Sequence, residues 1–355
     1  MKLVTIIGAR PQFIKAATVS RAIAAFDDIT EVIVHTGQHY DANMSDIFFD
    51  ELSIPRPDHH LGIGGGSHGA MTGRQIEAIE TVLMAEKPDF VLVYGDTNST
   101  LAGALAAVKL HIPLAHVEAG LRSFNRKMPE EINRILTDHA ADLLFAPTET
   151  AVRNLKSEGL PAERQRLVGD VMYDAALFYR ERAKEPKWFE GLSVQKGNYI
   201  LATIHRAEST NDPACLTSIL QGLAQADAPV ILPMHPRTHA RIREFDLEVP
   251  EAIHVVPPTG YLEMIWLEMH CAAIATDSGG VQKEAYFHGR PCITLREQTE
   301  WVELIESGWN TLVGADTGKI AAALSSLTRP EEGKPLYGTG NAAELIVKLL
   351  YEDAQ

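Results

Sequence analysis

Short apolar segments alternate with longer segments of helical periodicity along the whole chain. In the first half the apolar segments are rich in β-branched residues and end in a glycine, a polar turn or a helix start: Leu3–Ile7, Val32–His35, Phe90–Tyr94, Leu114–Val117 and Leu143–Ala146. The helical segments between them are Gln12–Ala25, Gly73–Ala85, Thr100–Leu110 and Glu130–Ala141. Continuous apolar strands separated by helices predict a parallel sheet that is covered on both faces.

The same alternation starts again in the second half. Its expected strands are Tyr199–Thr203, Pro229–Pro233, His254–Val256, Ala272–Thr276 and Pro291–Thr294, and its expected helices are Pro213–Ala224, Tyr261–Met269, Gly280–His288 and Lys319–Ser326. The charged segment Glu181–Gly197 has weak periodicity and is typical of a linker. The pattern therefore predicts an α/β fold of two doubly wound, Rossmann-like domains, residues 1–170 and 171–355, that face a cleft. We expect the amphipathic Ala342–Leu350 to pack back on the first domain.

Composition is that of a globular protein and restricts the partners. The 355 residues correspond to about two domains, with 45% apolar and 22% charged residues, which excludes long disorder. The 32 Lys and Arg against 47 Asp and Glu give a formal net charge of −15. Such a chain is a poor general binder of nucleic acid or of an anionic membrane. An anionic small molecule would have to be held by local cations and backbone N–H groups.

Neither a membrane segment nor a disulfide framework is indicated. No stretch approaches the roughly 18 apolar residues of a membrane helix, and the apolar start of the chain is too short for a signal peptide. The 3 cysteines, Cys215, Cys271 and Cys292, are far apart and lack a CxxC spacing. We therefore expect a cytoplasmic protein with reduced thiols and no structural zinc.

The turn after the first predicted strand is suited to binding phosphate. It reads Gly8-Ala9-Arg10-Pro11-Gln12, and Lys15 follows in the expected helix. Unpaired N–H groups at a helix start, with the cations Arg10 and Lys15, favour an anionic group. An ordinary βα turn with surface cations is the alternative. The glycines do not follow GxGxxG, so the fingerprint of dinucleotide binding is missing.

A second turn of this kind lies in Asp277–Glu284 (DSGGVQKE), between a predicted strand and a predicted helix. Ser278, Gly279 and Gly280 allow backbone N–H groups to approach a diphosphate. Glu284, about one turn into the helix, is placed to accept both hydroxyls of a ribose. The alternative is a glycine-rich turn with an acidic residue at a helix start, but the strand–turn–helix context favours nucleotide binding.

Three carboxylates follow predicted strands or begin a predicted helix of the first half: Asp96, Glu118 and Glu130. Each has a structural alternative, which is a helix N-cap for Asp96, an ion pair with Arg122 for Glu118 and a helix terminus for Glu130. Together they suggest proton transfer by groups whose pKa values are split within a shared site. In the second half, His205 follows a strand at a position where its imidazole would meet a substrate.

Other histidines give weaker signals of the same kind, among them His35, His39 beside Gln38, and the turn His235-Pro236-Arg237. The sequence contains no HExxH or comparable spacing, and we expect no catalytic metal.

Seven segments in this order resemble the non-hydrolysing UDP-N-acetylglucosamine 2-epimerase family: GARPQFIK (8–15), TGQH (36–39), GDTNST (95–100), HVEAGLR (116–122), PEEINR (129–134), HRAE (205–208) and DSGGVQKE (277–284). The resemblance implies the fold of B-type nucleotide-sugar glycosyltransferases, a homodimer and no cofactor. It implies inversion at C2 by anti elimination of UDP to a 2-acetamidoglucal, followed by re-addition. The C2 hydrogen is not acidic by itself, so its removal must be coupled to departure of the diphosphate.

Matching these motifs residue by residue assigns roles. The resemblance implies a catalytic set of Asp96, Glu118, Glu130 and His205, and UDP contacts at Arg10, Lys15, Ser278, Gly279, Gly280 and Glu284. Gln38-His39 and His235 resemble parts of the site at which some bacterial members bind a second UDP-sugar as an activator.

Three departures from the common family pattern bear on the sugar. Gln12 replaces the acid of RPE, Lys283 replaces the first acid of QEE, and Trp301 replaces the arginine of TERPE. With REQTEWVEL and GDVMYDA, they look like the branch that acts on UDP-2,3-diacetamido-2,3-dideoxy-glucuronate and makes a mannuronate precursor of bacterial surface polysaccharide. Lys283 is then a candidate partner for the sugar carboxylate, unless its side chain faces solvent.

Other functions stay open at this stage. Within the family, interconversion of UDP-N-acetylglucosamine and UDP-N-acetylmannosamine is the alternative, and a hydrolysing epimerase would release the free sugar. A glycosyltransferase of the same architecture would need an acceptor but not the three carboxylates together. A nucleotide-sugar sensor without turnover would have no use for three desolvated carboxylates.

Overall fold

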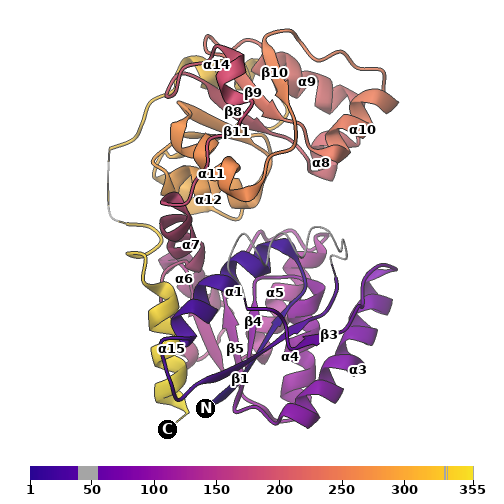
Figure 1. Ribbon diagram of the computed structural model, residues 1–355, viewed down its shortest axis with the longest axis vertical. Coiled ribbons are helices and arrows are strands. Elements are labelled where there is room, and N and C mark those ends of the chain that lie inside the picture. Colours follow the sequence, from indigo (N-terminus) through magenta and orange to yellow (C-terminus); the bar gives the residue numbers. More distant parts are fainter. Residues whose placement is uncertain (39–54, 332, 334, 355) are drawn as a thin grey trace. The chain divides into compact units, whose positions relative to one another are not determined.

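The computed structural model describes residues 1–38, 55–331, 333 and 335–354, and the chain divides into two units (Figure 1). The first unit contains Met1–Ala175 and Pro335–Gln355, and the second contains Ala176–Lys334. The division falls within helix α7 (Val171–Arg180), not at residue 170. Helix α15 (Ala342–Asp353) belongs to the first unit, where it packs on α1 (Arg10–Ile23).

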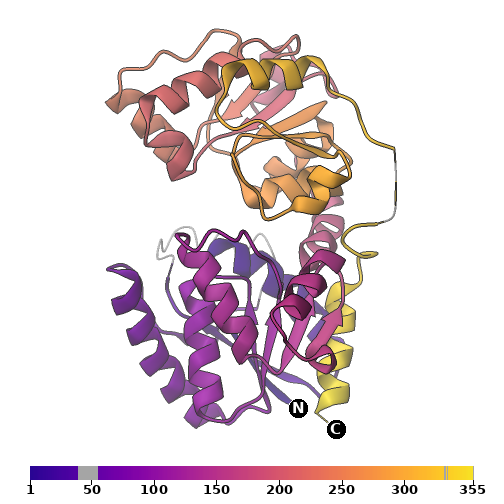
Figure 2. The same cartoon turned by 180° about the vertical axis from the view of Figure 1, so that it is seen from behind.

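The first unit is a doubly wound parallel sheet with the strand order β3-β2-β1-β4-β5-β6-β7. Its strands are β1 (Lys2–Ile7), β2 (Thr30–His35), β3 (His59–His60), β4 (Phe90–Tyr94), β5 (Leu114–Val117), β6 (Leu143–Ala146) and β7 (Gln165–Leu167). Its other helices are α3 (His68–Glu86), α4 (Asn98–Lys109), α5 (Pro129–Ala140) and α6 (Glu149–Ser157). Helices α1 and α15 lie on one face of the sheet, and α3, α4 and α5 lie on the other (Figures 1 and 2).

The second unit repeats this architecture with the order β10-β9-β8-β11-β12-β13, again with parallel pairing. Its strands are β8 (Ile200–Thr203), β9 (Val230–Pro233), β10 (Ile253–Val256), β11 (Ala273–Thr276), β12 (Cys292–Thr294) and β13 (Asn310–Leu312). Its helices include α8 (Ala207–Thr210), α9 (Pro213–Leu223), α10 (Pro236–Glu244), α11 (Tyr261–His270), α12 (Gly279–Phe287), α13 (Val302–Glu306) and α14 (Thr317–Ser325).

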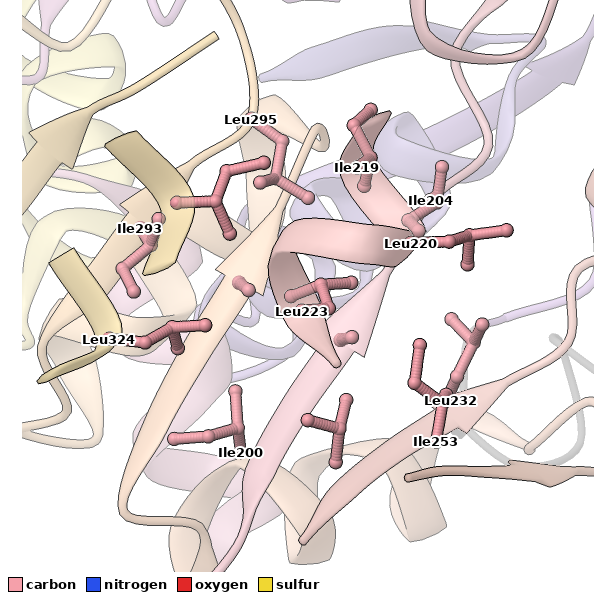
Figure 3. Packing of buried hydrophobic residues seen from close by; sticks show 14 of the residues in the cluster. Ile200, Ile204, Ile219, Leu220, Leu223, Leu232, Ile253, Ile293, Leu295 and Leu324 are labelled. Carbon is pink, nitrogen blue, oxygen red and sulfur yellow. The ribbon is translucent and has the colours of Figure 1, made fainter. Parts of the chain in front are cut away.

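One face of the second sheet packs on α9 and α14. Figure 3 shows Ile219, Leu220 and Leu223 of α9 next to apolar side chains of the strands. The strand residues in this cluster include Ile200 and Leu232. Apolar burial of this kind is the main favourable term in folding, so the cluster fixes α9 and α14 on the sheet.

Residues 181–197 do not form the linker that their charge suggested. They lie within the second unit and include a short 3₁₀ helix, Phe189–Leu192. Phe189 is buried, with its ring centroid 5.6 Å from that of Tyr199 and 4.8 Å from that of Trp266. Two large aromatic contacts anchor the segment although most of its residues are polar.

Candidate functional site

The predicted site residues cluster where the strand order reverses in each sheet. In the first unit β1 lies between β2 and β4, and in the second β8 lies between β9 and β11. The chain reaches Gly8 directly after β1, Asp96 after β4, His205 after β8 and Asp277 after β11. Open parallel sheets bind their ligands at such switch points, beyond the carboxyl ends of the strands.

Asp96 is held by an arginine that sequence reasoning did not select. Arg134 of α5 forms an ion pair with Asp96 through Nη2, and its Nη1 lies 3.1 Å from Glu131 Oε2. The backbone carbonyl of Asp96 accepts a hydrogen bond of 2.9 Å from Asn133. Thr97, not Asp96, is the N-cap of α4. The helix-cap alternative for Asp96 is therefore wrong, and its carboxylate is fixed at the carboxyl end of β4.

Glu131 is the neighbour of the predicted Glu130 and has a different environment. Glu131 is buried, and its carboxylate accepts hydrogen bonds from the Ser123 hydroxyl and the Ser123 and Phe124 N–H groups, at 2.8 to 2.9 Å. Glu130 is exposed in the first turn of α5. Glu131 thus ties α5 to the loop after β5, and Glu130 is accessible to a substrate. Both Glu131 and Arg134 belong to the motif PEEINR, but the spacing of the motif does not indicate which of its residues are structural.

Glu118 and Lys15 form a buried ion pair. Gly95 lies directly against both, since a Cβ placed on it would be 3.2 Å from Glu118 Oε2 and 3.2 Å from Lys15 Nζ. Glu118 also has a left-handed backbone with φ of 74°, a conformation that non-glycine residues adopt at a cost and that recurs at functional sites. The expected alternative partner, Arg122, instead contacts other carboxylates. The Glu118 carboxylate therefore lies beside the residue that precedes Asp96.

The turn after β1 is built around Gln12. Its Oε1 accepts hydrogen bonds from the Gly8 and Ala9 N–H groups at 2.8 and 3.0 Å. Its Nε2 donates to the Tyr94 carbonyl at 2.8 Å and to the Thr100 hydroxyl at 2.9 Å. The buried amide thus uses both polar atoms inside the first unit. Gln12 therefore shapes the turn, and its bearing on the sugar stays a prediction.

Arg10 is the first residue of α1, directly after the Gly8–Ala9 turn. Its backbone therefore lies at the N-terminus of a helix that starts at the switch point, where anions are favoured.

The weaker signals of the first half lie near the same edge. His35 ends β2 and stacks on His60, with ring centroids 4.6 Å apart. Burial and the nearby charge of His60 lower the pKa of His35 to about 4, so its imidazole is neutral. The Gln38 side chain accepts hydrogen bonds from the Ser99 N–H and hydroxyl groups at 3.0 and 2.8 Å. His39 lies outside the described residues.

In the second unit Asp277 orients His205. The buried Asp277 carboxylate accepts hydrogen bonds from the backbone N–H groups of His205 and Arg206, each at 2.9 Å. His205 Nδ1 lies 3.5 Å from Asp277 Oδ1, and its side chain is 37% exposed. The ring of His235 lies 5.2 Å from that of His205, measured between centroids. A carboxylate beside Nδ1 favours the tautomer with its hydrogen on that nitrogen.

The glycine turn 277–280 is packed closely at Gly279, where a side chain would displace Glu300. A Cβ on Gly279 would be 2.5 Å from Glu300 Oε1 and 3.7 Å from the Arg206 guanidinium. Ser278 is the N-cap of α12, and the Gly279 carbonyl accepts a hydrogen bond of 2.9 Å from Trp301 Nε1. The helix N-terminus, its backbone N–H groups and the nearby Arg206 form a binding site of the kind that suits a diphosphate.

Glu284 and Lys283 follow in α12, and both are buried. The ammonium of Lys283 lies 4.1 Å from the centroid of the Trp301 ring, which is also buried. The alternative that the Lys283 side chain faces solvent is therefore wrong, whereas its pairing with a sugar carboxylate stays a prediction. Its cation lies on an aromatic ring that braces the glycine turn.

No group of three or more histidine, cysteine, aspartate or glutamate side chains in the described part of the chain is arranged to hold a metal ion. Within that same part of the chain, no helix has the length and apolar character needed to cross a membrane. The cysteines Cys215, Cys271 and Cys292 are free thiols.

Comparison with known proteins gives full-length matches. The family described as UDP-N-acetylglucosamine 2-epimerase matches residues 21–351. The UDP-2,3-diacetamido-2,3-dideoxy-D-glucuronate 2-epimerase of Pseudomonas aeruginosa is 57% identical, with 99% of each chain covered. The UDP-GlcNAc 2-epimerase of Methanocaldococcus jannaschii, solved in complex with UDP-GlcNAc and UDP, is similar with a TM-score of 0.89 and 44% identity, over 99% of this chain and 100% of that one. The Neisseria meningitidis enzyme bound to UDP-GlcNAc has the same TM-score at 32% identity, over 99% and 100%.

Proposed function

Because the chain belongs to the non-hydrolysing UDP-N-acetylglucosamine 2-epimerase family, it is an isomerase of UDP-sugars, and we propose that it inverts C2 of UDP-2,3-diacetamido-2,3-dideoxy-glucuronate. The product is the mannuronate epimer, a precursor of bacterial surface polysaccharide. The 57% identity to the enzyme of that name from Pseudomonas aeruginosa supports this substrate. Interconversion of UDP-N-acetylglucosamine and UDP-N-acetylmannosamine is the alternative within the family.

The observation that carries the proposal is the gathering of carboxylates at the switch point of the first sheet. Asp96 is paired with Arg134, and Glu118 is paired with Lys15 beside Gly95. Glu130 is one helical turn from Arg134 on α5. The proposed reaction removes a proton from one face of a carbon and returns a proton to the other face. Such a reaction needs acidic groups in different environments, so that one acts as a base and another as an acid.

In the proposed reaction a base removes the C2 hydrogen while the C1–O bond to UDP breaks. UDP then adds back to the glucal, and an acid delivers a proton to the opposite face of C2. Asp96, Glu118, Glu130 and His205 form the proposed proton-transfer set. Departing negative charge on the diphosphate is stabilised by donors that are already in place.

The proposed UDP contacts come from two turns. In the second unit, Ser278, Gly279 and Gly280 present the N-terminus of α12 to the diphosphate, and Glu284 accepts the ribose hydroxyls. In the first unit, Arg10 at the start of α1 is the further phosphate contact. Lys15 is a further proposed UDP contact, and it is also the ion-pair partner of Glu118.

Incubation in deuterated water with each candidate UDP-sugar, followed by NMR, tests the reaction. We expect an inverted product with deuterium at C2, because the proton that is returned comes from exchangeable groups. An inverted product that keeps its original C2 hydrogen would exclude the elimination mechanism. Comparing kcat/KM for UDP-2,3-diacetamido-2,3-dideoxy-glucuronate and for UDP-N-acetylglucosamine decides the substrate. A clear preference for UDP-N-acetylglucosamine would overturn the proposed substrate.

Variants separate catalysis from binding. Asp96→Asn, Glu118→Gln and Glu130→Gln should each lower kcat by about 10²–10⁴-fold and keep affinity for UDP, because general acid–base groups act on the transition state. Glu163→Gln is the matched control, since this exposed carboxylate lies in the 3₁₀ turn Ala162–Arg164. Unchanged turnover in Glu118→Gln would remove that residue from the set.

Two further parts of the proposal concern the state of the protein. A homodimer is what the family implies, and light scattering of the purified protein measures it. Free thiols at all described cysteines support a reducing compartment and hence the cytoplasm.

A further inference from the structure

His116, on β5, is completely buried, and both of its ring nitrogens face acceptors. Nε2 lies 2.7 Å from the backbone carbonyl oxygen of Gly95, and Nδ1 lies 2.7 Å from Asp138 Oδ1. A carbonyl oxygen can only accept, so Nε2 carries a hydrogen. The protonation of the ring then depends on whether Asp138 is a carboxylate or a carboxylic acid.

The surroundings of Asp138 show that it is ionised. Its other oxygen, Oδ2, accepts hydrogen bonds from the Gly120 N–H at 3.1 Å and from Arg122 Nη1 at 2.7 Å. Both of these groups donate, and the permanent charge of Arg122 favours the carboxylate form of Asp138. An ionised Asp138 only accepts, so Nδ1 of His116 carries a hydrogen as well.

The charges of this cluster balance. Arg122 also donates to both oxygens of Glu158, at 2.6 and 2.8 Å, and His139 approaches the same carboxylate at 3.0 Å. Two cations, His116 and Arg122, thus face two carboxylates, Asp138 and Glu158. Buried charges are tolerated when they are paired and hydrogen-bonded in this way.

The cluster touches the backbone on both sides of the proposed catalytic acids. The Gly95 carbonyl, which His116 holds, belongs to the residue before Asp96. The Gly120 N–H, which Asp138 holds, lies two residues after Glu118, whose own N–H donates to the Phe145 carbonyl at 3.1 Å. These bonds keep the left-handed turn at Glu118 in place.

We propose that His116 carries a hydrogen on each ring nitrogen, each bonded to its acceptor, and that with Asp138 it acts as a positioning pair for Asp96 and Glu118. The positioning role rests on the proposed function of these two acids. The protonation state does not, and it can be measured without any substrate.

The first experiment is NMR of the full chain with labelled histidine. At about pH 8, well above the ordinary histidine pKa of about 6.5, we expect one ring with hydrogens on both nitrogens that exchange slowly with water. Loss of these signals in Asp138→Asn assigns them. A neutral ring at His116 would overturn the proposal. The spectrum of the wild-type protein alone suffices if Asp138→Asn does not fold, because the buried rings of His35 and His288 have lowered pKa values.

The second experiment uses Asp138→Asn in turnover. The amide oxygen can still accept from Gly120 and Arg122, and the amide nitrogen can donate to a neutral His116, so that the hydrogen bonds remain while the imidazolium charge is lost. We expect kcat to fall by about 10²-fold with affinity for UDP retained, because small displacements of reacting groups have effects of this size. His139→Gln, which changes the exposed histidine on the same helix, is the matched control and should retain kcat.

Each result has a separate meaning. If Asp138→Asn keeps the wild-type kcat, the positioning role of the charged pair is wrong even if the ring is protonated. If the wild-type protein turns over no UDP-sugar, the proposed function fails, and the NMR result still decides the protonation of His116.

Discussion

A buried histidine makes the stability of the second unit depend on pH in a way that can be calculated. His288 follows α12, and its Nε2 lies 3.6 Å from a carboxylate oxygen of Glu268 on α11, with both side chains 1% exposed. Burial, with the charges of Arg180 and Arg290, lowers the pKa of His288 from 6.5 to about 3. Burial, with the charge of Glu284, raises the pKa of Glu268 well above 4.5. The two groups therefore meet as a neutral imidazole and a neutral acid, not as an ion pair.

The magnitude follows from the two pKa values of His288. Between pH 6.5 and about 3 the unfolded chain binds a proton that the folded chain does not bind. Stability is therefore lost as the pH falls through 6.5, and the loss is complete below about pH 3. At about pH 5 the loss amounts to about 2 kcal/mol, since each pKa unit corresponds to about 1.4 kcal/mol. The variant His288→Leu has no imidazole at this position, so its free energy of unfolding does not fall for this reason.

The assay uses the position of the tryptophans. All 4 of them, Trp188, Trp266, Trp301 and Trp309, lie in the second unit, so fluorescence during urea unfolding reports that unit. Relative to wild type, the free energy of unfolding of His288→Leu should rise by about 2 kcal/mol between about pH 8 and about pH 5.

Glu268→Gln is the matched control, and its effect on the free energy of unfolding changes with pH in the opposite direction. Because the pKa of Glu268 is raised in the folded chain, its contribution to the free energy of unfolding is fully present below pH 4.5. This contribution is lost as the pH rises through the pKa of the folded chain. Glu268→Gln should therefore gain stability relative to wild type toward alkaline pH. If the difference between His288→Leu and wild type is the same at both pH values, His288 is not a buried neutral base and the reasoning fails.

Three further predictions concern the turns at the two switch points. Gln12→Glu should lower the free energy of unfolding by about 1–3 kcal/mol, because it removes the donor to two buried acceptors, and thermal unfolding measures this. Gly8→Ala should cost about 1–3 kcal/mol in the same assay, since the new Cβ would overlap two buried hydroxyl groups. Trp301→Phe should weaken UDP binding about fivefold by calorimetry, because the Gly279 carbonyl loses its donor and a hydrogen bond is worth about 1 kcal/mol. Unaltered affinity would show that Trp301 does not support the turn.

The strands of the first sheet were predicted well because they are continuous apolar runs. Phe90–Tyr94, Leu114–Val117 and Leu143–Ala146 were predicted with the bounds that the structure has. The edge strands His59–His60 and Asn310–Leu312 were missed, because two or three partly exposed residues give no apolar run. Helix α10 was missed as well, and its sequence PRTHARIRE is mostly polar, with only Thr238 and Ile242 buried.

The sequence predicted the positions of the candidate residues at the ends of strands, but not the side chains that contact them. A residue that directly follows an apolar strand of a parallel sheet must lie at its carboxyl edge, and this placed Asp96, Glu118 and His205 correctly at the ends of strands. The partners come from elsewhere in the chain, and Arg134 is 38 residues from Asp96. No periodicity connects such pairs, because helix α5 and strand β4 meet only after the sheet has formed.

The buried position of Lys283 changes how selectivity for an acidic sugar must be explained. Lys283 has 2% of its surface exposed, and its ammonium lies 4.1 Å from the Trp301 ring centroid. Trp301 in turn donates to the Gly279 carbonyl, so replacing the family's usual residues at positions 283 and 301 alters the packing beneath the glycine turn. Arg206 is the cation that approaches the turn itself, 3.7 Å from where a Cβ of Gly279 would be. A carboxylate on the sugar needs a partner once water is excluded, and Arg206 is a cation that lies beside this turn.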